Sequence, residues 1–131
     1  MEYIGDYSHP RNYYMVPEFI FNLDMTHTAM VLYGRLYSRC FMSLKNNIVD
    51  ADGHAYCFYP VDDMAHDMRC SKRTIMSALN ELEKYDLIDR RKTKGINHIY
   101  AKYAFLPYKE HAEGDELAAL MIEASEGKLV Q

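Results

Sequence analysis

The 131-residue sequence lacks several features that would place it in a familiar class. It has only three cysteines, and no apolar run approaches the roughly 20 residues that a membrane-spanning helix needs. Its tyrosine-rich start does not have the design of a signal peptide. Cys40, Cys57 and Cys70 are widely spaced without a CxxC pair, which argues against a disulfide framework or a zinc site. The sequence therefore predicts a cytoplasmic protein with no membrane segment and with reduced, mostly buried thiols.

Motifs for catalysis and metal binding are also missing. No glycine-rich phosphate loop is present, so an ATPase is not supported. His66 and Asp67 are adjacent, but a metal phosphohydrolase needs further His/Asp pairs, and the other histidines do not supply them. The run "DADG" at 50–53 resembles half of a calcium loop, yet no glutamate follows at the twelfth position. We therefore predict no enzymatic activity, no metal site and no cofactor.

What the chain does have is enough apolar material for one folded domain. The hydrophobic fraction of 49% and the 17 aromatic residues (12 Tyr and 5 Phe) exclude general disorder. We expect an N-terminal arm over residues 1–15, a folded domain over 16–104 and an acidic C-terminal tail over 105–131. Within the tail, the run "DELAALMIEAS" could form a helix.

Basic side chains are concentrated in one part of this acidic protein. The formal net charge is −4. Residues 70–103, however, hold 8 Lys and Arg against 4 Asp and Glu, a local net of +4, while residues 1–69 and 104–131 each carry −4. A phosphate backbone responds to the field within roughly 8–10 Å, so the local balance matters more than the total. The distribution favours a polyanion-binding surface.

Apolar spacing and turn signals predict a succession of short elements. Thr26 is a good N-cap for a long helix whose apolar stripe runs from Ala29 to Leu44, and Ser71 is a good N-cap for another. The expected order is a short helix from Pro17, a helix to about Asn46, a hairpin around "DADG", a helix over 61–69, a helix over 71–85, and a hairpin formed by 87–92 and 98–103. This order predicts an α+β, mainly helical fold, namely a winged helix-turn-helix with two short β-hairpins.

The helix predicted over 71–85 has two distinct faces. One face is apolar and would pack on the preceding helices: Ile75, Ala78, Leu79 and Leu82. On the opposite face, four side chains without negative charge fall within about 60° of one another: Arg73, Ser77, Asn80 and Lys84. Such side chains donate to phosphates, and Arg and Asn can read G and A in the major groove. Ser71 and Lys72 add to an anion-favouring helix N-terminus.

A second basic cluster stands at the expected tip of the last hairpin. It consists of Arg90, Arg91, Lys92 and Lys94, just before Gly95. Like charges this close repel one another by some tenths of a kcal/mol per pair, so the hairpin does not need them for stability. A solvated polar face and turn would also show basic residues. Two basic surfaces, placed where a winged helix meets a groove and its backbone, favour DNA binding.

Several segments carry a resemblance to one family. These are "YYMVPEFIF", "LYGRLYSR", "SLKNNIVDADGHAY" and "CSKRTIMSALNELEKYDLIDRRK", followed by a glycine and "IY". Over residues 13–103 the chain resembles the N-terminal domain of the RepA plasmid replication initiators of Gram-positive bacteria. It departs from that family in two respects. Its wing lacks a proline, and the sequence ends at residue 131, whereas such initiators continue through a variable linker to a C-terminal domain.

The resemblance implies a function and a set of partners. It implies a homodimer that binds repeated double-stranded DNA sites at a plasmid-type origin, starts replication and recruits host replication proteins. By position, the recognition helix would be Ser71 to Tyr85 and the wing Arg90 to His98. Two alternatives stay open at this point, a transcriptional repressor of the same fold and a protein-interaction module that uses the tyrosine-rich arm and the acidic tail.

Overall fold

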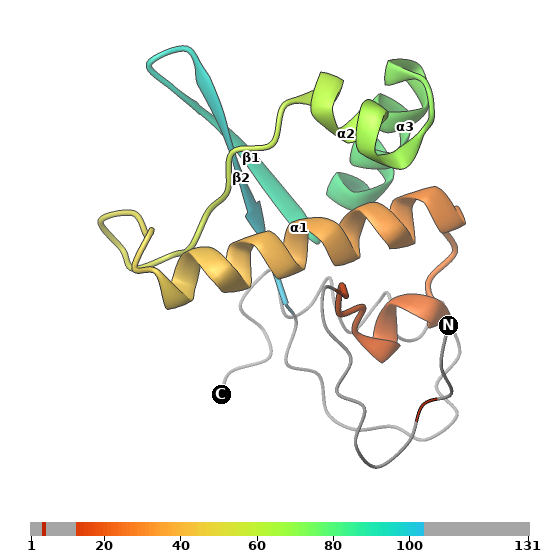
Figure 1. Cartoon of the computed structure of the whole chain (residues 1–131), viewed down its shortest axis with the longest axis horizontal. Helices are drawn as coiled ribbons and strands as arrows, with labels where there is room; N and C mark the ends of the chain where they lie inside the picture. Colours follow the sequence, from red (N-terminus) through yellow and green to blue (C-terminus); the bar gives the residue numbers. More distant parts are fainter. Residues whose placement is uncertain (1–3, 5–12, 104–131) are drawn as a thin grey trace.

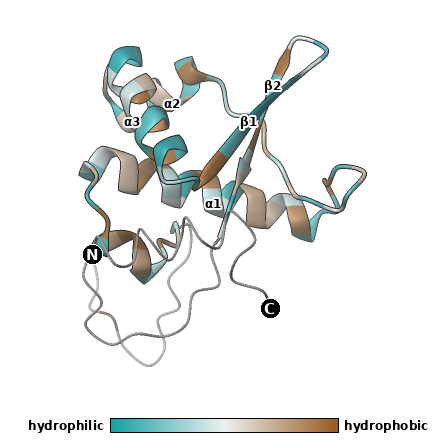
Figure 2. Ribbon diagram, turned by 180° about the vertical axis from the view of Figure 1, so that it is seen from behind, coloured by the Kyte–Doolittle hydropathy of each residue, from teal (hydrophilic) through white to brown (hydrophobic). Residues whose placement is uncertain are grey.

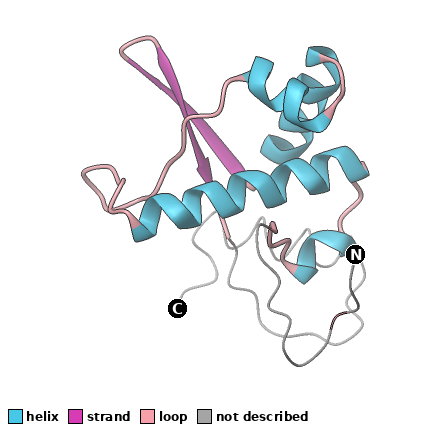
Figure 3. Cartoon of the chain, in the orientation of Figure 1, coloured by secondary structure: helices cyan, strands magenta, loops and turns pink. Residues whose placement is uncertain are grey.

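The computed structural model describes residue 4 and residues 13–103, as a helical unit with one projecting hairpin (Figure 1). The elements, in chain order, are a 3₁₀ helix η1 (Glu18–Asn22), α1 (His27–Lys45), α2 (Val61–Met68), α3 (Lys72–Lys84), β1 (Ile88–Thr93) and β2 (Ile96–Ala101). Helices and strands occur in the order of a winged helix-turn-helix (Figure 3). The expected acidic tail and most of the expected N-terminal arm lie outside the described residues. No helix within the described ranges is both long and apolar enough to cross a membrane.

Helix α1 is the support on which α3 and β2 pack. Its N-cap is Thr26, as predicted, and the Thr26 side chain accepts a hydrogen bond from the Ala29 backbone N–H at 3.2 Å. The first part of the predicted apolar stripe is buried, but Phe41 and Leu44 are exposed. Both residues lie in the C-terminal end of α1, which extends past the other helices (Figure 1).

The two helices of the helix-turn-helix are joined by a tight turn. Helix α2 ends at Met68 and is capped by Arg69, whose left-handed backbone (φ 54°) reverses the chain. The Ser71 hydroxyl then accepts a hydrogen bond from the Thr74 backbone N–H at 3.1 Å and caps α3. Met64 and Ala65 of α2 are buried and pack in the same core as the apolar face of α3. This turn therefore holds α3 with its opposite face outward.

The last hairpin forms as predicted and is the wing. Strands β1 and β2 are antiparallel, and Thr93 pairs with Ile96 across a two-residue loop. Both loop residues, Lys94 (φ 52°) and Gly95 (φ 80°), have the left-handed backbone that a tight hairpin turn of this length requires. β2 begins at Ile96, two residues earlier than the expected start at 98. The reason is the tightness of this loop, which brings the second strand back at once.

The first predicted hairpin is shorter than expected. The turn at "DADG" forms, but its flanks pair only through an isolated bridge between Val49 and Ala55. The following segment leaves this turn, and Cys57 pairs instead with Ile99 of β2. The Cys57 N–H donates to the Ile99 carbonyl and the Ile99 N–H to the Cys57 carbonyl, each at 2.9 Å. The backbone of this segment thus forms hydrogen bonds with the wing rather than within a second hairpin.

The core lies between α1, the helix-turn-helix and the root of the wing. Its largest fully buried side chains come from all of these elements and from η1: Tyr33, Ile20, Leu32, Leu36, Met64, Ile75, Leu79, Leu82 and Leu87. Hydrophilic residues run along most of the hairpin and over α3, whereas the start of β1 is hydrophobic (Figure 2). The wing is therefore anchored at its root and projects a polar tip.

Candidate nucleic-acid interface

The exposed face of α3 carries the predicted stripe. Ile75, Ala78, Leu79 and Leu82 are all at most 1% exposed, which confirms the apolar face. The four residues of the stripe are exposed: Arg73, Ser77, Asn80 and Lys84. Within the described part of the chain, no carboxylate pairs with any of them. The donors of this stripe are therefore available to a ligand.

The two glutamates beside the stripe are both engaged. The Glu81 carboxylate accepts hydrogen bonds from the Thr26 backbone N–H (3.0 Å) and the Thr26 hydroxyl (2.6 Å). A carboxylate in this position also favours the N-terminus of α1 through the helix dipole. On the other flank, Glu83 forms an ion pair with Arg90 of the wing. The negative charges closest to the stripe therefore serve to join α3 to α1 and to β1.

The two predicted DNA-binding side chains at the N-terminus of α3 already have partners within the protein. The Ser71 hydroxyl is used as the helix cap. The Lys72 ammonium lies 2.6 Å from the Asp62 carboxylate of α2, although both side chains are well exposed, at 68% and 70%. An exposed ion pair of this kind contributes at most about 1 kcal/mol. Lys72 can thus exchange Asp62 for a phosphate at little cost.

The wing separates the four predicted basic residues because successive side chains of a strand point to opposite faces. Arg90 and Lys92 share one face, and the ion pair of Arg90 with Glu83 shows that this face is turned toward α3. Arg91 points to the other face. Lys94 lies in the loop at the tip. The structure therefore brings Arg90 into contact with α3, sets Lys92 on the same face of the wing and Lys94 at its tip, and turns Arg91 away.

Arg91 is held by neighbours on the far face of the wing. Its Nε donates to the Asp89 carboxylate at 2.8 Å, and its Nη1 lies 3.7 Å from Asp50. Its guanidinium also stacks over the Tyr100 ring, 4.5 Å from the centroid. These contacts link the wing to the "DADG" turn. Arg91 is accordingly a structural residue of the wing more than a free cation.

Asn97 is a residue of this surface that the sequence reasoning missed. It pairs with Lys92 across the hairpin, so its exposed side chain shares the wing face that is turned toward α3. The signal was present in the loop: a two-residue Lys-Gly turn fixes the register and sets Asn97 opposite Lys92. The ion-pair partners of Glu83 and Arg91, by contrast, could not be predicted from any pattern in the sequence.

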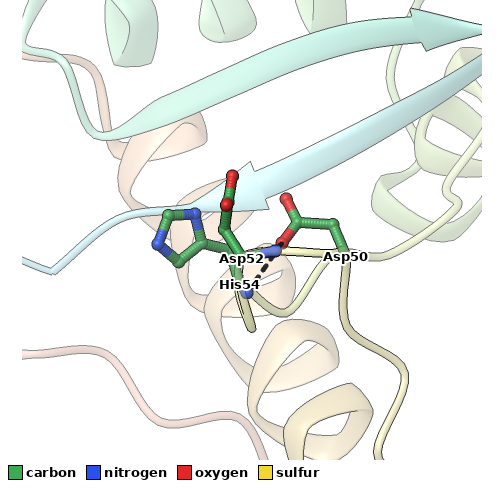
Figure 4. A group of neighbouring side chains, drawn as sticks. All are labelled: Asp50, Asp52 and His54. Carbon is green, nitrogen blue, oxygen red and sulfur yellow. Dashed lines mark hydrogen bonds between the residues drawn. The ribbon is translucent and has the colours of Figure 1, made fainter.

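The "DADG" turn gathers a group that could be taken for a metal site, Asp50, Asp52 and His54 (Figure 4). One possible ligand atom of each residue lies within 4.8 Å of the others. Asp50 Oδ1 already accepts the backbone N–H groups of His54 and Asp52, both at 2.9 Å. The His54 N–H chiefly holds the pKa of Asp50 below its usual range. Since Arg91 also approaches Asp50, we interpret the group as a capped turn.

Comparisons with known proteins agree on one family and one fold. The family model described as "Replication initiator protein A (RepA) N-terminus" matches residues 12–111. A solved structure described as "Structure of MDR initiator" is 25% identical to this chain, covers 88% of it and 89% of its own length, and superposes with a TM-score of 0.61. No curated protein matches this chain.

Two further solved structures share the fold. One, described as "N-Terminal domain of DNA binding protein", is 21% identical over 92% of this chain and 90% of its own, with a TM-score of 0.63. The other, described as "Structure of Rep-DNA complex", is 22% identical over 92% of this chain and 91% of its own, with a TM-score of 0.61. The predicted fold class is confirmed by these likenesses.

Proposed function

This chain belongs to the family of replication initiator protein A N-termini, and from that membership we propose that it binds double-stranded DNA at a plasmid-type replication origin. One observation supports the proposal most directly. The exposed stripe of α3 and the wing residues Lys92 and Lys94 present donors and positive charge that are not paired with a carboxylate within the described residues. A phosphate backbone with bases beside it is the ligand that such a surface suits.

The proposed mode of binding assigns different roles to the two basic surfaces. α3 enters the major groove, where Arg73 and Asn80 read base edges by paired hydrogen bonds and Ser77 adds a hydroxyl contact. Lys84, Lys92 and Lys94 hold phosphates and set the register. Arg90 can join them only by leaving Glu83, and Arg91 only by leaving Asp89. Sequence preference would thus come from α3, and much of the affinity from the wing.

The proposal extends to assembly and cellular role. Repeated sites suit a homodimer, and the exposed aromatic side chains of Tyr13 (64%) and Tyr14 (48%) offer apolar contact area for a second copy. We propose that the domain acts in the cytoplasm, is not itself an enzyme and works with host replication proteins. Membership of the family supports the proposed assembly, location and partners.

Binding to the DNA around its own gene tests the function. Fluorescence anisotropy would compare duplexes carrying repeats from within or beside the gene with shuffled duplexes of the same length and composition. We expect the repeats to be preferred, and the preference to persist when raised salt weakens binding to the shuffled DNA. Preference for an operator of a neighbouring operon would indicate a repressor instead. Equal binding to every duplex, or none, would contradict the proposal.

A further inference from the structure

Two buried cysteines meet at the root of the wing. Cys40 lies on α1 and is 6% exposed, and Cys57 lies in the segment before α2 and is 7% exposed. Both contact the same atom of β2, the Ile99 carbonyl oxygen: the Cys57 backbone N–H donates to it at 2.9 Å, and the Cys40 thiol donates to it at 3.5 Å. Two residues 17 positions apart in the sequence are thereby brought side by side.

The two thiol groups also interact with each other. The proximity of the two side chains is the main cause that lowers the pKa of Cys40 and raises that of Cys57. The backbone N–H of Ala101 donates to the Cys40 sulfur at 3.4 Å and stabilises its thiolate further. A thiol reacts as a nucleophile through its thiolate form. The lowered pKa therefore makes Cys40 the more reactive of the two sulfurs.

Small molecules have a route to the Cys57 side of this pair. A surface groove of about 480 Å³ reaches Cys57, and its walls are largely apolar, with Met42, Ile48 and Phe58 among the lining residues. A neutral oxidant such as hydrogen peroxide can enter an apolar groove, whereas a large or charged reagent is disfavoured. The third cysteine, Cys70, is half-buried within the α2–α3 turn and does not line the groove.

We propose that Cys40 and Cys57 form a redox modification site, which a peroxide oxidises to an intramolecular disulfide. The Cys40 thiolate attacks one oxygen of the peroxide, the O–O bond breaks, and Cys40 becomes a sulfenic acid while hydroxide takes up a proton. The Cys57 sulfur then attacks the Cys40 sulfur, an S–S bond forms, and water leaves. In total the two thiols lose two electrons and two protons, and one peroxide is reduced to two waters.

The bond would fasten the wing to its support. Cys57 already pairs with Ile99 in β2, so a disulfide to Cys40 would connect that backbone ladder covalently to α1. The cross-link closes a short loop and restrains the unfolded chain. We expect the oxidised protein to melt roughly 5–15 °C higher than the reduced one. This inference goes beyond the proposed function and does not depend on it.

Peptide mapping provides the test, because trypsin separates the three cysteines. Cleavage after Arg39, Lys45, Arg69 and Lys72 places Cys40 in residues 40–45, Cys57 in 46–69 and Cys70 in 70–72. The folded full-length chain would be treated with hydrogen peroxide, alkylated and digested without reductant. We expect a loss of about 2 Da in intact mass and one linked peptide, 40–45 joined to 46–69, that dithiothreitol separates.

Variants make the outcome specific. Cys70→Ser should still form the linked peptide, and Cys40→Ser and Cys57→Ser should not form it. The wild-type experiment needs no substitution, so a variant that fails to fold leaves the test intact. The proposal is overturned if peroxide gives no linkage in the folded protein, if the linked peptide contains residues 70–72, or if linkage appears only after denaturation.

Discussion

The carboxylate of Glu83, in the last turn of α3, forms an ion pair with the guanidinium of Arg90, the third residue of β1. This contact links the helix proposed to read bases with the wing proposed to hold phosphates. It also neutralises one of the basic residues that the sequence assigned to DNA. The charge that the wing presents to DNA therefore depends on its acidic neighbours as well as on its basic residues.

Replacing Glu83 with Gln should strengthen DNA binding. The change removes a negative charge between α3 and the wing and frees Arg90 for a phosphate. We expect affinity to rise several-fold and the slope of log K against log[salt] to become steeper by up to about 1 unit. The melting temperature should change little, since a partly exposed pair contributes at most about 1 kcal/mol. Glu18→Gln, an exposed change on η1, is the charge-matched control. Weaker or unchanged binding of the Glu83 variant would be contrary evidence.

Removing the two lysines of the wing that have no carboxylate partner among the described residues should reduce binding to all sequences. In the double variant Lys92→Ala and Lys94→Asn, asparagine is used at the tip because it tolerates the left-handed backbone there. The salt slope should fall by about 1–2 units, and specific and random duplexes should lose affinity alike. Arg91→Ala should change the slope less, because Asp89 and Asp50 already surround that guanidinium. An unaltered slope in the double variant would show that the wing does not contact phosphates.

The stripe on α3 should control sequence preference. Arg73→Ala or Asn80→Ala should each cost roughly 1–3 kcal/mol on the preferred duplex and little on random DNA, because a lost base contact penalises only the correct sequence. Titrations of each variant against both duplexes measure the difference. Both side chains are exposed, so melting temperatures should stay close to that of the wild type. Equal losses on both duplexes would remove these two residues from base reading.

Tyr33 should make the fold sensitive to alkali. Its ring is fully buried, its hydroxyl donates to the Lys102 carbonyl at 2.6 Å, and burial raises its pKa above the usual value. The raised pKa means that the neutral form stabilises the fold. This contribution is complete below about pH 10 and is lost as the pH rises further.

The variant Tyr33→Phe tests this dependence. It should lose about 1 kcal/mol at neutral pH through the missing hydrogen bond. It should also lose less stability than the wild type between pH 9 and 11, because it has one fewer buried group to ionise. Thermal melts across that range measure both effects, and Tyr13→Phe, at an exposed position, is the control. Parallel pH profiles of wild type and Tyr33→Phe would count against the assignment.

Deletion of residues 1–14 should weaken assembly. The truncated chain lacks the aromatic side chains of Tyr13 and Tyr14, which are exposed in the single chain. Light scattering should show a dimer for the full chain, free or on a duplex with two sites spaced by whole helical turns of roughly 10 bp. The truncated chain should dissociate at higher concentration. A full-length chain that stays monomeric on such a duplex would rule out the proposed homodimer.

The sequence by itself determined the order of the elements and the two faces of α3. Its caps, Thr26 and Ser71, and the Lys-Gly turn are local signals, and local backbone chemistry decides where helices begin and hairpins reverse. The apolar spacing within residues 71–85 was enough to predict which side chains are buried. The position of the stripe followed directly from that spacing.

Only the tertiary structure decided which charges are free and which thiols meet. Arg90 and Arg91 are adjacent in sequence, yet strand alternation turns them toward different carboxylates, Glu83 and Asp50, that come from distant segments. Cys57 could have continued a hairpin, but β2 offered its backbone a partner and placed the thiol beside Cys40. Contacts between segments depend on packing over long separations, and no local pattern in the sequence encodes them.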